Sequence, residues 1–152
     1  GTRVVFADND YSTKMQTKRT GGETVMELVK NDSGAAMLPN KVVKYGAAAG
    51  ERRNTVDAYA GANDTGHGVV DEFLPAAGVP NGEYFWMAVD GPCKIINSSA
   101  AALVIGDHIL TSATGEVGKR AAEADNDDYI GTAEAAIATS ATGIIYFRPR
   151  VV

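Results

Sequence analysis

The sequence predicts a mainly β protein, a small barrel or sandwich with at most short helices. Short apolar segments rich in β-branched and aromatic residues recur along the chain, most densely over residues 83–152. Turn signals separate them about every 8–12 residues, a spacing typical of small all-β domains. Seventeen glycines, with abundant Ala, Thr and Ser, favour tight turns over long helices.

Length and composition indicate one β-rich domain. The 152 residues are 45% hydrophobic, enough for a core without a metal or disulfide staple. We place this domain at residues 23–152, after an N-terminal arm over residues 1–22, with sub-lobes 23–78 and 79–152 as an alternative division. The single Cys93 forms no internal disulfide, which suits a reducing compartment.

Charge and hydropathy exclude two classes of partner. The net charge of −5 and the pI near 5.0 argue against nucleic acid, because the phosphate backbone binds basic surfaces. No segment approaches the roughly 18 apolar residues that span a bilayer, so we expect no membrane partner.

The N-terminal region is read in two ways. Residues 3–6 form a short apolar strand candidate, and residues 7–22 are polar with no apolar period. One reading is a mobile terminus. The other is an extended arm that orders on a neighbouring subunit. The residues that would form this protein interface are Arg3, Val4, Phe6, Tyr11, Lys14, Met15, Lys18 and Arg19.

The first half of the domain reads as strands joined by turns. Residues 24–30 form a strand and residues 31–34 a turn. A second strand over residues 37–45 is entered through Pro39, and we expect the two to form a hairpin. Further strands are expected at residues 55–59 and 69–74.

The second half has the clearest strand pattern. Strands are expected at residues 84–89, 94–96, 109–111, 129–132 and 144–147. Turns are expected at residues 90–92, 106–107, 113–115 and 141–143. Residues 121–128 and 133–139 are the only helix candidates, each of one or two turns. The Pro-Asn pairs at residues 39–40 and 80–81, each leading into a strand, hint at a weak repeat.

The sequence contains no convincing catalytic or cofactor site, so we expect no enzyme. Asp107 and His108 are adjacent, so on a strand their side chains point to opposite faces, and no Gly-x-Ser-x-Gly elbow accompanies them. Asp107 is expected to cap its turn. Asp125, Asn126, Asp127 and Asp128 lack the spacing of a calcium loop, and an acidic turn or a weak cation site remain open.

The second half resembles the small β-barrel of tailed-phage capsid decoration proteins, also called cement or head-stabilising proteins. The matching features are the Asp90-Gly91-Pro92 turn, the Gly106-Asp107 turn that opens a strand, the Ile130-Gly131-Thr132-Ala133 element and the final strand over residues 143–147. Residues 30–43 are similar to an N-terminal hairpin of the same group. The family has no catalytic residues to carry over.

The resemblance implies a virion structural protein on the capsid exterior, made in the host cytoplasm. It would bind the major capsid protein, bridge neighbouring subunits and associate with itself as a trimer or a dimer. Three alternatives stay open: a tail or head–tail connector protein, a small β-barrel hydrolase, or a carbohydrate-binding module that uses Tyr59, Tyr84 and Trp86.

Overall fold

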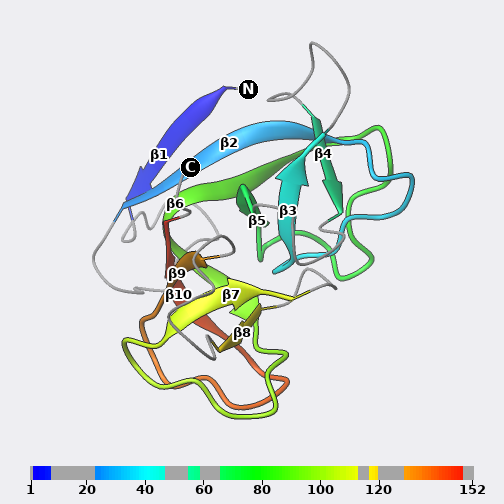
Figure 1. Cartoon of the computed structure of the whole chain (residues 1–152). Helices are drawn as coiled ribbons and strands as arrows, with labels where there is room; N and C mark the ends of the chain where they lie inside the picture. Colours follow the sequence, from blue (N-terminus) through cyan, green and yellow to red (C-terminus); the bar gives the residue numbers. More distant parts are fainter. Residues whose placement is uncertain are drawn as a thin grey trace.

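The computed structural model describes residues 2–7, 23–46, 55–58, 66–112, 117–119 and 129–148. These residues contain strands and turns and no helix, which confirms the mainly β fold (Figure 1). The strands are β1 (Arg3–Ala7), β2 (Glu23–Asn31), β3 (Val42–Tyr45), β4 (Thr55–Ala58), β5 (Gly68–Val70), β6 (Tyr84–Ile96), β7 (His108–Thr111), β8 (Val117–Lys119), β9 (Tyr129–Ala133) and β10 (Thr142–Phe147).

The strands join in one sheet that partly closes on itself. Its order is β1-β2-β4-β3-β5-β6-β10-β9-β7-β8, with β2 also paired to β6. The β2–β6 pairing closes β2, β4, β3, β5 and β6 into a ring, and β10, β9, β7 and β8 continue from β6. In Figure 1 the ring is the upper part of the molecule and the continuation is the lower part.

Several local predictions are wrong, among them the strand at residues 69–74, of which only Val69 and Val70 belong to β5. The second predicted strand is shortened to β3, and β4 lies between β2 and β3, so these two do not form a hairpin. Residues 133–139 are not helical, because Ala133 ends β9 and Ile137 forms a β-bridge with Leu103. The other helix candidate, residues 121–128, lies outside the described residues.

The predicted turn at Asp90-Gly91-Pro92 is instead the middle of β6, a single strand of 13 residues. The pairing of β6 with β2 shifts register here: Val25 pairs with Asp90 and Met26 with Ala88. Gly91 has φ +92°, a left-handed value that glycine adopts without strain. The shift leaves Val89 as the extra residue of a β-bulge, and Gly91 follows two residues later within the same continuous strand.

The molecule contains an internal duplication that the sequence analysis missed. The first unit comprises β2, β3, β5 and the first half of β6, and the second unit comprises the second half of β6, β7, β9 and β10. Each of four backbone pairings in the first unit has a counterpart in the second. Val29↔Phe85 corresponds to Ile95↔Gly143, and Val42↔Val69 corresponds to His108↔Thr132. Val70↔Met87 corresponds to Ala133↔Ile145, and Met37↔Val79 corresponds to Leu103↔Ile137. Strand β6 is thus the last strand of one unit and the first of the next.

Turn conformations repeat in the same way. Each unit has two tight turns whose third residue has a positive φ, namely Asn40 (63°) and Gly82 (89°) in the first unit, and Gly106 (85°) and Ser140 (60°) in the second. A positive φ at the third residue is the requirement of a type II turn. The two Pro-Asn pairs that hinted at a repeat lie in the two turns of the first unit.

A buried asparagine holds each pair of turns together. The Asn31 amide donates to the carbonyl oxygens of Ala35 (2.7 Å) and Val79 (2.9 Å). The Asn97 amide, at the matching position, donates to Ala101 (3.1 Å) and Ile137 (3.1 Å). Both asparagines are fully buried, so these bonds satisfy groups that water cannot reach.

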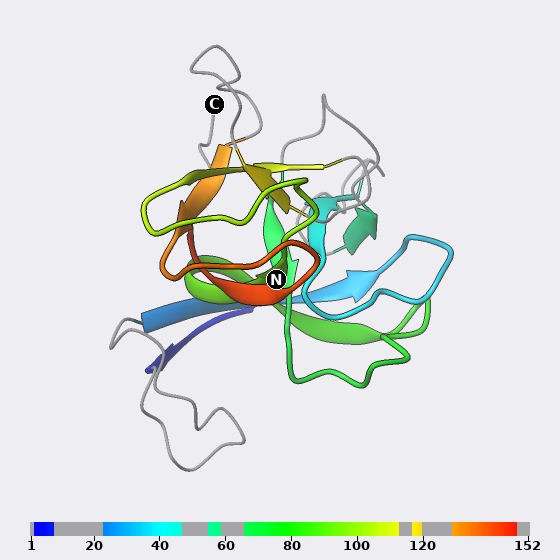
Figure 2. The ribbon, with the colours of Figure 1, turned by 90° about the horizontal axis from the view of Figure 1, so that it is seen from below.

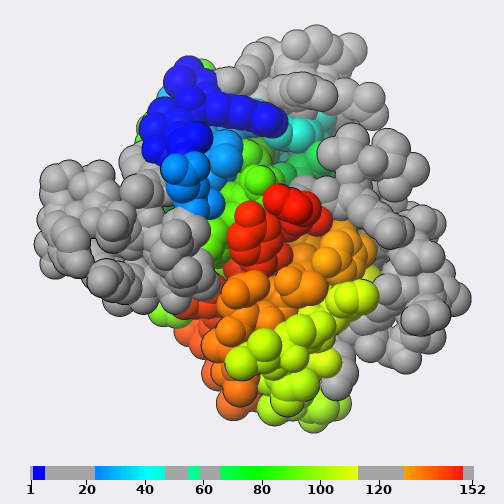
Figure 3. Space-filling view, turned by 90° about the vertical axis from the view of Figure 1, so that its left-hand side faces the viewer, coloured from blue at the N-terminus to red at the C-terminus, as the bar shows by residue number. Residues whose placement is uncertain are grey.

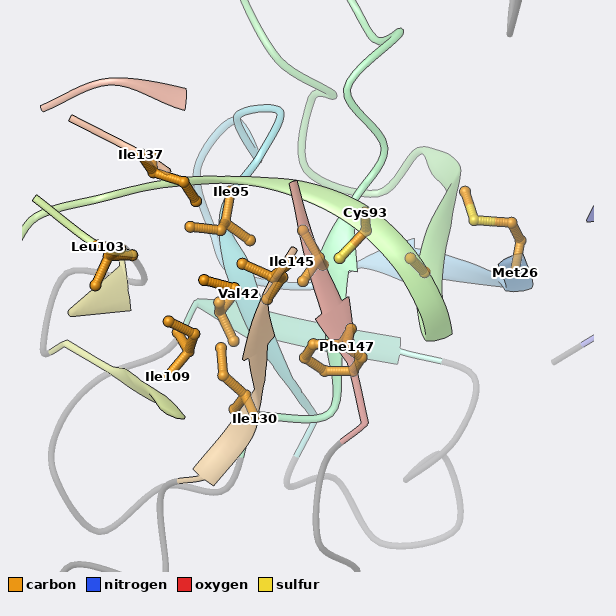
Figure 4. Close-up of a cluster of buried hydrophobic side chains, with 13 residues drawn as sticks. Met26, Val42, Cys93, Ile95, Leu103, Ile109, Ile130, Ile137, Ile145 and Phe147 are labelled. Carbon is orange, nitrogen blue, oxygen red and sulfur yellow. The ribbon is translucent and has the colours of Figure 1, made fainter. Parts of the chain in front are cut away.

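The larger core cluster lies between the two units. It draws on Met26 and Val42 from the first unit and on Ile109, Ile130 and Phe147 from the second (Figure 4). Cys93 belongs to this cluster and is buried, as expected of a small apolar residue. A second cluster lies in the first unit and the adjoining β4, with Phe85, Met37 and Met87 its largest members.

Candidate functional site

The predicted interface residues divide between a described strand and residues outside the described part of the chain. The strand predicted at residues 3–6 is confirmed as β1, which pairs antiparallel with β2. Arg3 and Val4 lie on it, and Figure 3 shows β1 on the surface. The Phe6 side chain, Tyr11, Lys14, Met15, Lys18 and Arg19 lie outside the described residues, so their role stays a prediction.

Arg3 binds a buried carboxylate within its own chain. Its Nε lies 2.7 Å from Oε2 of Glu27, a β2 residue with only 2% of its surface exposed. Tyr45 donates its hydroxyl to the same oxygen at 3.2 Å. A buried carboxylate needs such partners, since desolvation penalises its charge. The Arg3–Glu27 pair therefore attaches the N-terminal strand to the domain.

The electrostatics of this cluster follow from burial and pairing. The hydrogen bond to Glu27 raises the pKa of Arg3 above its ordinary value. Burial, which disfavours the phenolate, raises the pKa of Tyr45, and the nearby Glu27 carboxylate adds to the effect. The Tyr45 ring also packs against His67 with 4.7 Å between ring centroids. Sequence reasoning missed Glu27, although a charged residue inside the apolar run Val25–Val29 is a usable signal.

The residues first considered for catalysis have structural roles. The Asp107 carboxylate accepts a hydrogen bond from the Val104 backbone N–H at 2.8 Å and so caps its turn, as predicted. His108 is exposed and packs edge-on to Tyr129 at 5.3 Å. Among the described residues, no three His, Cys, Asp or Glu side chains gather as metal ligands. Residues 125–128 lie outside the described part.

Two surface features repeat with the internal duplication. We call residues 35–40 and 77–82 the first tip, and residues 101–106 and 135–140 the second tip. Within each tip, the two segments meet at one β-bridge, Met37↔Val79 or Leu103↔Ile137. The four bridging side chains are buried, while most of the other tip residues face outward. The tips lie on different sides of the molecule, the first at the right of Figures 1 and 2 and the second at the bottom of Figure 1.

The tips expose apolar side chains at matching positions. Leu38 is 42% exposed, and Val104, its counterpart in the second unit, is 54% exposed. Ile105 is 73% exposed, and alanines occupy exposed positions in both tips. None of the four segments contains Asp, Glu, Lys, Arg or His, although 22% of the chain is charged. Each segment is bordered by a charged residue, namely Lys41, Glu83, Asp107 or Glu134, so each tip has an uncharged centre and a charged rim, as protein interfaces commonly do.

Comparison with known proteins relates the fold to a phage protein. No family model and no curated protein matches the sequence. The fold is similar to the crystal structure of the head fiber gp8.5 N base of bacteriophage phi29, with a TM-score of 0.54 and 11% sequence identity. The similarity covers 82% of this chain and 94% of that one. At this identity the likeness establishes a shared fold, and the resemblance to decoration proteins stays a prediction.

The described residues contain no helix that could cross a membrane.

Proposed function

We propose that this protein is a structural component of a tailed-phage virion. It binds the outer surface of the assembled capsid and stabilises it by bridging neighbouring subunits of the major capsid protein. It acts by contact and not by catalysis, is made in the host cytoplasm and associates with itself as a trimer or a dimer.

The fold likeness is the observation that carries this proposal. The similar structure is the base of a phage head fiber, and nearly all of that base has a counterpart in this chain. Of the motifs that resemble decoration proteins, the Gly106-Asp107 turn and the final strand are present in the fold, whereas the Asp90-Gly91-Pro92 turn and the N-terminal hairpin are not. The exposed apolar side chains of the two tips, Leu38, Val104 and Ile105, provide surfaces through which such a protein could bind a partner.

A carbohydrate-binding module is less well supported. A sugar platform would need exposed, neighbouring rings, but Trp86 is half-buried and packs against the larger core cluster. Tyr84 is exposed at 65%, and Tyr59 lies outside the described residues. A hydrolase is also less well supported, because the carboxylate of Asp107, one of the two residues considered for catalysis, is hydrogen-bonded to the Val104 N–H of its own turn. A tail or head–tail connector protein remains the runner-up.

Binding to purified particles tests the proposal. Capsids that lack this protein, in mature and in precursor form, are mixed with it and sedimented. We expect saturable binding with a strong preference for one of the two lattice states, because the contacts between subunits change on maturation. Failure to bind either form, with binding to tails or connectors instead, would favour the runner-up. Sedimentation of the free protein measures its oligomeric state.

A further inference from the structure

We propose that the first and second tips are two equivalent docking sites, each of which packs against an apolar surface of one capsid subunit. One copy of the chain would thereby hold two subunits. This inference rests on the proposed function and adds to it the contact surface, its chemistry and its valency.

The duplication is the reason to expect two equivalent sites. Both tips have the same β-bridge, the same buried asparagine lock and the same positive-φ positions. A surface that appears twice in one chain fits a partner that is itself present in many identical copies. A capsid lattice is such a partner, because its subunits repeat by symmetry.

Charge defines the chemistry of the partner surface. Exposed turns are usually polar, yet the four tip segments carry no ionisable side chain. A charged group placed over the centre of such a tip would lose its hydration and gain no pairing there. The charged residues that border the segments, among them Glu83, Asp107 and Glu134, can pair with polar groups at the edge of the contact. The complementary surface is therefore apolar at its centre and polar at its rim.

Side-chain size defines the closeness of the contact. The exposed alanines Ala35 and Ala36 have the counterparts Ala101 and Ala102 in the second tip. Such short side chains allow a partner backbone to approach closely and lose almost no rotamer entropy on burial. One tip alone buries little surface, but two tips on one rigid core act together and raise the overall affinity.

The test compares matched variants in the full-length protein. Leu38→Asp alters the first tip, Val104→Asp alters its counterpart in the second, and Ala58→Asp is the control at an exposed position of β4 outside both tips. All three side chains are exposed, and thermal melts confirm that each variant is folded. Binding to the preferred capsid form is measured for each variant and for the Leu38→Asp, Val104→Asp double variant.

Each single tip variant is expected to weaken binding by about tenfold or more, since about 1.4 kcal/mol corresponds to a factor of ten. The two losses should agree within about threefold, the double variant should not bind detectably, and the control should bind as wild type. Wild-type binding should weaken only modestly between about 0.05 and about 0.5 M salt, because screening acts on the charged rim of the contact and not on its apolar centre.

The outcomes separate this inference from the proposed function. If the wild-type protein does not bind capsids, the proposed function is wrong and the inference is withdrawn with it. If the wild type binds but both tip variants bind equally well, or only one tip matters, the proposed function stands and two equivalent sites are excluded. Tip variants that dissociate an oligomer of this chain and still bind capsids would also overturn the inference.

Discussion

Asn31 and Asn97 show how single buried residues fix this fold. Asn31 is the last residue of β2, and Asn97 directly follows β6. Each uses its amide to bind carbonyls from two segments that are far apart in sequence. Each also accepts hydrogen bonds through Oδ1 from the residue two positions later, Ser33 or Ser99. The shared Asn-x-Ser pattern is visible in the sequence. Its meaning is not, because the partner carbonyls are brought together only by the fold.

Replacement of either asparagine should destabilise the protein. Asn31→Ala and Asn97→Ala each leave buried backbone groups without their side-chain partner, at an expected cost of about 2–3 kcal/mol. Urea unfolding measures the free energy of unfolding. The control is Asn81→Ala, which removes only an exposed hydrogen bond to the Gly34 N–H and should cost less than about 1 kcal/mol. Equal stability of all three variants would contradict the proposed role of the buried amides of Asn31 and Asn97.

Because of Tyr45, the fold is expected to lose stability at alkaline pH. Its pKa is raised above the ordinary value of 10.0, so the unfolded chain loses the phenolic proton first. This contribution to stability is complete below pH 10.0 and is lost as pH rises through the folded-state pKa. Tyr45→Phe should therefore make the fall in melting temperature above pH 10.0 less steep, whereas Tyr84→Phe, at an exposed site, should not.

At the scale of single elements, the close approach of β6 to the start of β2 depends on Gly91. A Cβ atom at this residue would lie 2.1 Å from the Glu23 carbonyl oxygen, and the backbone is also in the left-handed region. Gly91→Ala should cost about 3 kcal/mol or more. Gly82→Ala is the matched control, because φ is +89° there but the space is open, and it should cost about 1 kcal/mol. Chemical denaturation of both variants measures the difference.

Strand β1 is predicted to be dispensable for folding. Its described side chains belong to neither core cluster, and its attachment is the backbone ladder with β2 plus the Arg3–Glu27 pair. Deletion of residues 1–20 should leave a cooperatively folded but less stable domain, and Glu27→Gln in that background should restore part of the loss by removing a buried charge. Calorimetry measures both effects.

The same deletion tests the arm in capsid binding. If the arm contributes contacts, binding should weaken sharply while the core stays folded. Unchanged binding would leave the tips as the contact surface and exclude a role for the arm.

Elements with strong local patterns were predictable, and those set by distant partners were not. The apolar runs of β2, β6, β9 and β10 identify strands because their apolar residues either alternate with polar ones or follow one another without interruption. The Asp90-Gly91-Pro92 segment has the chemistry of a turn, yet pairing with β2 and β10 holds it in a strand. Ala133 to Thr139 is alanine-rich, but the Leu103↔Ile137 bridge overrides its helix propensity.

For the whole molecule, duplication is the feature that sequence reading missed. A short pattern does repeat, because Asn31-x-Ser33-x-Ala35-Ala36 recurs as Asn97-x-Ser99-x-Ala101-Ala102. Other counterparts, such as Val70 and Ala133, share position but little side-chain character. The repeated pairings and turn conformations, which establish the duplication, appear only in the folded chain. The candidate tips were missed for this reason, since each segment alone reads as an ordinary turn.

An electron-microscopy map of the phage head carrying this protein tests the central claim most directly. The account predicts density for the chain on the outside of the capsid, with Leu38 and Val104 each against a different subunit of the lattice. A map that places the protein in the tail, or on the head with both tips facing solvent, would contradict it.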